Sequence, residues 1–168
     1  TVIHPSASVA PTLLAWSEQR RVSGPELLHA FILGVETSCR IGNAVSPSHY
    51  EAGWHITATC GVLGAAVAAG KALGLEVQQM AWALGIAATQ ASGIREVVLG
   101  SMCKSYNMGH AARNGLSSAL LAAGNFTSSE RALDAPRGFL NVLATHCDTA
   151  EITRDLGSRW ELMQNAYK

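Results

Sequence analysis

Three segments of the sequence place ionisable side chains among small residues, where they could bind an anion or move a proton. The first is His4-Pro-Ser, the second is Gly53-Trp-His55, and the third runs from Met102-Cys-Lys104 to Gly109-His-Ala-Ala-Arg113. Polar loops between buried elements are common places for functional sites. Histidine and lysine together suit a site that holds a carboxylate and exchanges a proton beside it.

Lys104 is expected in a loop, about seven residues before the body of the next helix. A lysine there can hold an anion as a point charge, or act as an acid or base once it is desolvated. A solvated loop lysine is the alternative interpretation. His55 stands at a predicted helix start, where it can carry a proton near neutral pH or simply cap the helix. His4, taken alone, has the pattern of an ordinary terminal side chain.

The helix predicted after Lys104 carries further polar groups. His110 and Asn114 are four residues apart and are expected to share a face. Arg113 can bind a carboxylate through two hydrogen bonds, or can pair with an acidic neighbour. A helix start near Gly109 would favour an anion. The remaining histidines are interpreted as structural: His29, His49 and His146.

Several catalytic classes leave motifs that this sequence lacks. It contains no GxGxxG, Walker, GxSxG or HExxH motif. Its four cysteines form no CxxC pair and show no zinc spacing. We therefore expect a site without a metal and without a cofactor. The formal net charge of zero argues against nucleic acid as a partner, because phosphate binding needs a basic face.

Glycine, proline and serine divide the chain into helical patterns, and only residues 96–99 suggest a strand. Ser23-Gly-Pro-Glu26 predicts an N-cap, and Gly74 predicts a helix end. The expected class is all-α, a bundle-like packing of helix on helix, and residues 1–168 are expected to be part of one such domain. The predicted helices cover residues 5–20, 24–45, 56–73, 77–90, 110–123, 128–132 and 138–144.

The composition indicates what surrounds this domain: its covering partners, the solvent or membrane, and the cell compartment. Only 14% of residues are charged while 48% are hydrophobic, so a second domain, a partner subunit or further chain is expected to cover part of its surface. The uncharged run of 15 residues from Ile56 to Gly70 is shorter than the roughly 20 that a spanning helix needs. We expect a buried helix and no membrane. The cysteines suit a reduced, cytoplasmic setting, or a mitochondrial one with the targeting segment outside this chain.

In these segments the sequence resembles the MmgE/PrpD family over nearly all of its 168 residues. The matching pieces follow the family's order and spacing. They are His4-Pro-Ser-Ala-Ser-Val, residues 34–42, Gly53-Trp-His55 with the small-residue helix after it, residues 85–93, Met102-Cys-Lys104 and residues 109–115. Residues 155–157, Trp160 and residues 165–168 resemble the family's approach to a second lysine-containing segment.

The family includes 2-methylcitrate dehydratase, cis-aconitate decarboxylase and iminodisuccinate epimerase. Its members combine a large helical domain with a smaller α+β lid and are usually homodimers, which the resemblance implies here too. It also implies a catalytic cleft that contains His4, His55, Lys104 and Lys168. The expected groups for binding substrate carboxylates are Lys104, Lys168, Arg113 and His110.

The expected function is therefore a lyase that dehydrates or decarboxylates a small di- or tricarboxylic acid by metal-free acid–base catalysis. An epimerase of a dicarboxylate such as iminodisuccinate and a non-catalytic helical dimerisation module are the alternatives. The family's lid and the acidic segment that precedes its first histidine are not in this sequence, so we expect the isolated 168 residues to be inactive. Ser105 and Asn107 depart from the proline and histidine of many relatives, which leaves the substrate open.

Overall fold

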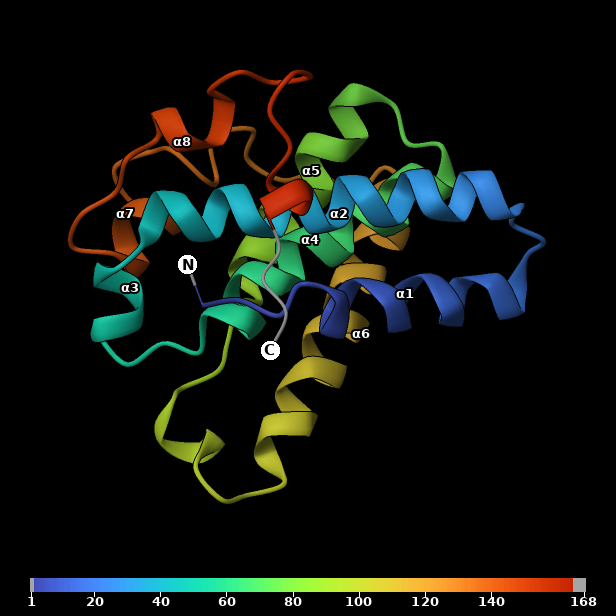
Figure 1. The fold of residues 1–168 in the computed structure, drawn as a ribbon. Helices are drawn as coiled ribbons and strands as arrows, with labels where there is room; N and C mark the ends of the chain where they lie inside the picture. Colours follow the sequence, from blue (N-terminus) through green and yellow to red (C-terminus); the bar gives the residue numbers. More distant parts are fainter. Residues whose placement is uncertain (1, 165–168) are drawn as a thin grey trace.

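The protein is a bundle of α-helices, described here by a computed structural model over residues 2–164. Within that range the only strand-like pairing is an isolated bridge between Trp54 and Ile94. The predicted all-α class is confirmed (Figure 1). The helical elements in chain order are α1 (Ser6–Gln19), α2 (Gly24–Val45), α3 (Ser48–Glu51), α4 (Ile56–Leu73), α5 (Val77–Thr89), η1 (Glu96–Val98), α6 (Cys103–Ala123), α7 (Phe139–Leu143), α8 (Ala150–Thr153) and η2 (Glu161–Gln164).

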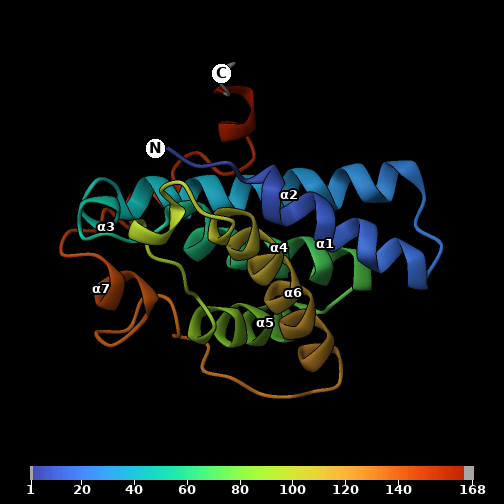
Figure 2. The ribbon, with the colours of Figure 1, turned by 90° about the horizontal axis from the view of Figure 1, so that it is seen from below.

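Helix α4 is the centre of the bundle and contacts α1, α2, α5 and α6. Figure 2 shows α4 between α1 and α2 on one side and α5 and α6 on the other. Small residues make this central position possible. A Cβ atom on Gly34 of α2 would lie 2.6 Å from the carbonyl oxygen of Gly64, and one on Gly115 of α6 would lie 2.8 Å from the backbone nitrogen of Ala66. The helices therefore meet almost backbone to backbone.

The apolar run in the middle of the sequence is a buried helix, as predicted. By length and composition α4 could cross a membrane, with 18 residues and a mean hydropathy of 1.5, but 78% of it is buried among the other helices. It ends at Gly74, whose φ of 71° lies in the left-handed region that glycine favours. Both the helix and its terminating glycine agree with the sequence prediction.

The start of α2 also follows the prediction. The Ser23 hydroxyl accepts the backbone N–H of Glu26, and the Glu26 carboxylate accepts the backbone N–H of Ser23 at 2.9 Å. These two bonds form a capping box that satisfies backbone donors at the helix end. The helix then runs to Val45, where the pattern placed its end.

Three local predictions were wrong. Residues 96–99 contain the 3₁₀ helix η1 and no strand, because an isolated extended run has no neighbour to satisfy its backbone groups. Residues 128–132 form no helix, and only 130–132 lie in turns. The carbonyl of Ala132 accepts the N–H of Phe139 at 2.9 Å, which stabilises the start of α7 instead. The predicted loop over residues 46–55 contains the short helix α3.

The largest correction concerns α6. It begins at Cys103, whereas the sequence predicted a start at His110. Gly109 was interpreted as a boundary, but it lies inside the helix, where a Cβ atom would meet nothing within 4 Å. The loop before α6 and its first turns extend away from the other helices (Figure 1). Lys104 is therefore a helical residue in the first turn of α6.

Candidate active site

His55 occupies the N-cap of the central helix. Its backbone N–H donates to the carbonyl of Gly93 at 3.0 Å, and its own carbonyl accepts the N–H groups of Ala58 and Thr59. The side chain is buried, with 8% of its surface exposed. Its ring does not cap the helix, since no side-chain capping bond is formed there. The backbone thus fixes His55 while the imidazole remains available for other contacts.

His4 lies directly before α1 and reaches the first turn of α4. Its backbone N–H donates to the Thr57 hydroxyl at 3.3 Å, and the same hydroxyl lies 3.5 Å from His4 Nδ1. Thr57 is buried, whereas His4 is exposed. A histidine that the sequence alone could only treat as terminal is therefore held beside the helix that carries His55.

Lys104 completes the group from a third segment. Its position in the first turn of α6 leaves the side chain exposed. Its positive charge, with that of His4, acts on His55. Burial of the imidazole, and then the charges of Lys104 and His4, lower the pKa of His55 below the usual 6.5. The structure thus brings three of the four predicted catalytic residues together and favours a neutral His55 at physiological pH.

Asn107 and Gly93 support His55 from two sides. The Asn107 side-chain nitrogen lies 3.3 Å from His55 Nδ1. Gly93 has a φ of 122°, and a Cβ atom built on it would lie 3.0 Å from Ala58 Cβ and 3.5 Å from His55 Cβ. A side chain at this position would be strained by the backbone conformation and would crowd Ala58, the residue of α4 that accompanies His55.

His110 lies one turn beyond Asn107 on α6. Its Nδ1 is 3.2 Å from the Ser92 hydroxyl and 3.3 Å from the Asn114 side-chain nitrogen, which confirms the shared face with Asn114. Its ring stacks on Tyr106 with 5.8 Å between ring centroids. Arg113 is exposed and donates to the Asn114 side-chain oxygen. Besides Lys104, this helix carries two predicted carboxylate-binding groups. His110 lies beside the loop that contacts His55, while Arg113 hydrogen-bonds only to its neighbour Asn114 in the described part of the chain.

Sequence comparison matches most of this chain to a known domain. Residues 1–151 match the sequence model of the MmgE/PrpD N-terminal domain. The chain belongs to the MmgE/PrpD family. The match covers the three segments that supply His4, His55 and Lys104, so the resemblance seen in the sequence is confirmed.

Individual MmgE/PrpD-type relatives extend the comparison. The chain is 36% identical over 171 residues to the cis-aconitate decarboxylase of Aspergillus terreus, which covers 94% of this chain and 35% of that protein. It is 32% identical to the cis-aconitate decarboxylase-like protein oryM of Aspergillus oryzae, over 95% of this chain and 36% of that one. The human cis-aconitate decarboxylase is 33% identical over 81% of this chain and 29% of its own length. The chain therefore spans about a third of the length of these relatives.

The fourth residue predicted for the MmgE/PrpD site, Lys168, lies outside the described residues. His49, interpreted as structural, is fully buried and bonded at both ring nitrogens, to the Leu143 carbonyl and the Thr59 hydroxyl. Within residues 2–164 no group of three or more His, Cys, Asp or Glu side chains is placed to hold a metal ion.

Sequence reasoning missed the residues that orient the histidines. In the sequence, Thr57 is one residue of an uncharged run, and Gly93 is the last residue of a segment that resembles the family. Ser92, which contacts His110, was also missed. The pairs His4–Thr57 and His55–Asn107 are separated by 53 and 52 residues, so spacing within one element could not reveal them. The one local signal in the sequence was the glycine at position 93, because glycine is the residue that tolerates the positive φ found there.

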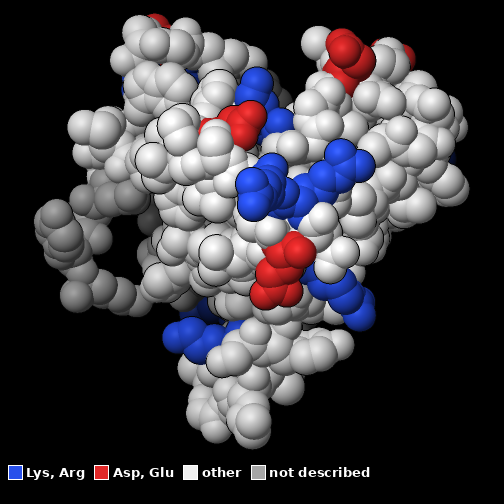
Figure 3. Space-filling model, turned by 90° about the vertical axis from the view of Figure 1, so that its right-hand side faces the viewer, with Lys and Arg blue, Asp and Glu red and all other residues white. Residues whose placement is uncertain are grey.

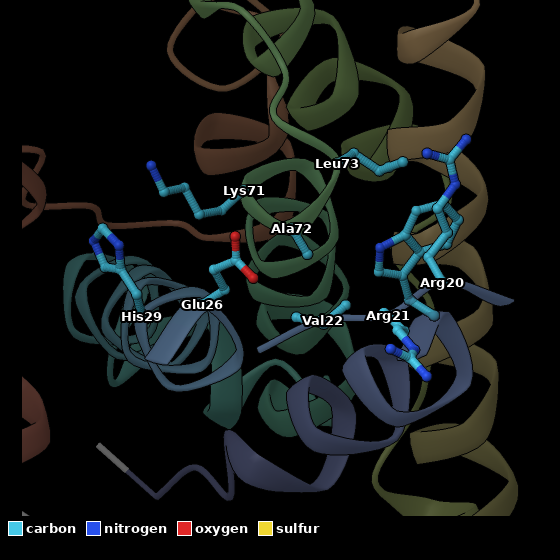
Figure 4. A pocket seen from close by; sticks show the side chains of 9 residues that line it. Arg20, Arg21, Val22, Glu26, His29, Lys71, Ala72 and Leu73 are labelled. Atoms are coloured by element: carbon cyan, nitrogen blue, oxygen red, sulfur yellow. The ribbon is translucent and has the colours of Figure 1, made fainter. Parts of the chain in front are cut away.

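A separate cavity lies at another part of this MmgE/PrpD-type bundle, where the link between α1 and α2 meets the end of α4. It holds about 500 Å³ and is lined by residues that include Trp16, Arg20, Arg21, Glu26 and Lys71 (Figure 4). Basic and acidic side chains lie close together on this end of the molecule (Figure 3). The Glu26 carboxylate there already accepts the backbone N–H of Ser23. Of the predicted catalytic residues that the structure describes, none lines this cavity.

Proposed function

We propose that this chain forms the N-terminal part of a lyase that decarboxylates or dehydrates a small di- or tricarboxylic acid, with a cis-aconitate-type decarboxylation as the leading reaction. The observation that carries the proposal is the convergence of His4, His55 and Lys104 from three separate segments. Two relatives named cis-aconitate decarboxylase, and one named as like it, match nearly all or most of the chain and favour that reaction.

The chemistry of these groups suits the reaction. In a decarboxylation the bond between carbon and the departing carboxylate breaks, carbon dioxide leaves, and the electron pair stays on the substrate. A conjugated neighbouring carboxylate delocalises that pair, and a proton then completes the carbon. The Lys104 ammonium binds a carboxylate and stabilises the developing charge. The nearby histidines provide donors and a proton path.

The remainder of the site is proposed to come from Lys168 and from other parts of the enzyme. Only 14% of the residues in the sequence are charged, which suits a domain that is partly covered by further chain or by a second copy, and we propose a homodimer. If the site instead placed a base on each face of one substrate carbon, the enzyme would be an epimerase. If the chain were a non-catalytic dimerisation module, the protein would convert no substrate.

The test is Lys104→Ala in the full-length enzyme, with cis-aconitate, 2-methylcitrate and iminodisuccinate as substrates. We expect kcat/KM for the true substrate to fall by about 100-fold or more, since one charge-stabilising group is removed. Lys71→Ala is the matched control, because Lys71 is also an exposed lysine but lies in the last turn of α4, away from His55.

Product analysis by NMR in heavy water separates the reactions. Loss of carbon dioxide identifies a decarboxylase and loss of water a dehydratase, whereas exchange without either loss identifies an epimerase. Turnover that is equal in Lys104→Ala, Lys71→Ala and the parent enzyme would overturn the assignment of Lys104. No turnover of any polycarboxylate by the parent enzyme would overturn the proposed function.

A further inference from the structure

The contact between Asn107 and His55 joins the two helices that meet at the site. Asn107 lies on α6, in the turn after Lys104, and its Nδ2 is 3.3 Å from Nδ1 of His55 at the N-cap of α4. Gly93 lies against both residues, since a Cβ atom there would be 3.5 Å from each of Asn107 Nδ2 and His55 Cβ. The loop after α5, through Gly93, therefore packs against both side chains of the contact.

The atoms of this contact determine where the imidazole carries its hydrogen. The side-chain nitrogen of asparagine is a donor and never an acceptor. His55 Nδ1 must therefore accept, so it has a lone pair and no hydrogen. A neutral imidazole has one N–H group, and that hydrogen must then be on Nε2.

The second ring nitrogen is open to a ligand. No hydrogen bond joins His55 Nε2 to any residue between 2 and 164. Over the same residues, Ser38 Oγ is the only completely buried side-chain nitrogen or oxygen without a partner, so His55 Nε2 retains access to solvent. A donor that is fixed, nearly buried and unpaired is suited to an anionic group that enters the site.

We infer that Asn107 is a positioning residue that holds neutral His55 in the tautomer with its hydrogen on Nε2, so that His55 presents a hydrogen-bond donor and not a base to the substrate. The inference rests on the proposed function for the substrate and on the Asn107–His55 contact for the tautomer. The inference assigns charge stabilisation and proton donation to different residues. His55 donates to the oxygen that gains negative charge when carbon dioxide leaves, and the proton that completes the carbon comes from another group, such as a cationic Lys104 or His4.

The surrounding charges agree with a neutral His55. Lys104 faces it from α6 and His4 from the segment before α1, and both are positive when protonated. Burial, which is the largest effect, and these two charges lower the pKa of His55. The nearest charged group of the loop after α5, Arg95, is directed elsewhere, since its guanidinium lies 3.7 Å from the centre of the Tyr50 ring. No carboxylate contacts His55 within the described range.

Asn107→Asp in the full-length enzyme tests the inference. An aspartate can only accept, so it takes the Nδ1 hydrogen and stabilises the imidazolium. The matched control is Asn125→Asp, the same change two residues beyond the opposite end of α6. Asn125 has a φ of 61°, a conformation that Asp tolerates, and its side-chain oxygen accepts a bond from Gln79 that an aspartate can also accept.

The first readout does not depend on activity. Hydrogen–deuterium exchange at the histidine ring carbon Cε1, followed by mass spectrometry over a pH series, gives the titration midpoint of His55. We expect the midpoint to rise by about one pH unit or more in Asn107→Asp and to stay in place in Asn125→Asp. Equal midpoints in the two variants would overturn the inference, even in an enzyme whose substrate is unknown.

The second readout is the pH dependence of kcat. The parent enzyme should lose no activity when His55 becomes neutral, because neutral His55 still has its Nε2 hydrogen. Asn107→Asp should gain a new limb in which activity falls as pH rises through the raised midpoint, because the neutral form then has its hydrogen on Nδ1. A parent enzyme whose activity instead requires the loss of a proton from Nε2, or an Asn107→Asp profile without the new limb, would contradict the donor role. A shifted exchange midpoint without any turnover would leave the tautomer intact and count against the proposed function alone.

Discussion

Arg40 and Glu36, one turn apart on α2, form an ion pair that is almost completely buried, with 2.7 Å between Arg40 Nε and Glu36 Oε1. The other carboxylate oxygen of Glu36 accepts the backbone N–H of Leu162 at 3.2 Å. The terminal nitrogens of the guanidinium donate to the carbonyl oxygens of Glu151, Ile152, Arg154 and Arg159. One pair of side chains thus holds the last described segment of the chain against α2.

Removing Arg40 should therefore be costly. In Arg40→Leu the Glu36 carboxylate is left buried without its partner, and several carbonyl groups lose their donor. Truncating one member of a buried pair typically costs about 3–5 kcal/mol. We expect a loss of this size in the free energy of unfolding of the intact protein, measured by urea denaturation.

Arg131→Leu is the control for that measurement. Arg131 and Asp134 also form an ion pair, but both side chains are more than half exposed, so we expect a change below about 1 kcal/mol. Similar losses in the two variants would show that the buried pair does not stabilise the C-terminal segment. Because Lys168 follows Leu162 by six residues, Arg40→Leu should also lower turnover in the full-length enzyme if the proposed site is correct.

The contact between α4 and α6 predicts opposite effects for two glycines of the same helix. In Gly115→Ala the new methyl group would collide with Ala65 and lie 2.8 Å from the backbone nitrogen of Ala66, so the helices must separate. We expect destabilisation by about 1–3 kcal/mol. In Gly109→Ala the methyl group meets nothing within 4 Å, and higher helix propensity should stabilise by up to about 1 kcal/mol. Thermal unfolding of both variants measures the two changes in stability. If both substitutions stabilised the protein, or both destabilised it, the close packing at Gly115 would be contradicted.

The parts of the fold that the sequence predicted are those with local signals. Ser23 and Glu26 form their capping box within four residues, and Gly74 ends α4 through its own backbone conformation. The start of α6 was predicted wrongly because Gly109 was interpreted as the boundary before the helix. No steric conflict requires a boundary there, since a Cβ atom on Gly109 would meet nothing within 4 Å, and the helix continues through it from Cys103.

The parts that could not be predicted depend on contacts between distant segments. Arg40 reaches carbonyl groups 111–119 residues away, and nothing near Arg40 in the sequence specifies them. In the candidate site, the resemblance to the MmgE/PrpD family identified His4, His55 and Lys104, but their proximity depends on how α4 and α6 pack. The orienting roles of Thr57 and Asn107 follow from that packing and have no local pattern.

Cysteine reactivity offers a prediction that is independent of catalysis. Burial raises the pKa of Cys60 to about 12 and that of Cys39 to about 11, so neither thiol forms its reactive anion near neutral pH. Cys103 is exposed in the first turn of α6. We expect iodoacetamide to modify Cys103 in the native protein, and Cys60 only after unfolding. Peptide mass spectrometry of the labelled protein checks the order, and early labelling of Cys60 would show that the core around α4 opens.

His49 should make stability depend on pH. The imidazole is fully buried, and burial lowers its pKa below 6.5 despite the opposing hydrogen bond to the Leu143 carbonyl. The unfolded chain therefore takes up a proton at a higher pH than the folded protein does. The neutral form contributes its full stability above about pH 6.5, and that contribution is lost as the pH falls towards the lowered pKa. His49→Gln should lower the free energy of unfolding by about 1–3 kcal/mol at about pH 8, and this loss should shrink at about pH 5.

His29→Gln is the control for His49→Gln. His29 is exposed and lines the separate cavity, so its replacement should leave the free energy of unfolding nearly unchanged at every pH. Urea denaturation at several pH values gives these differences, and a cost for His49→Gln that does not change with pH would show that His49 is not buried as a neutral group.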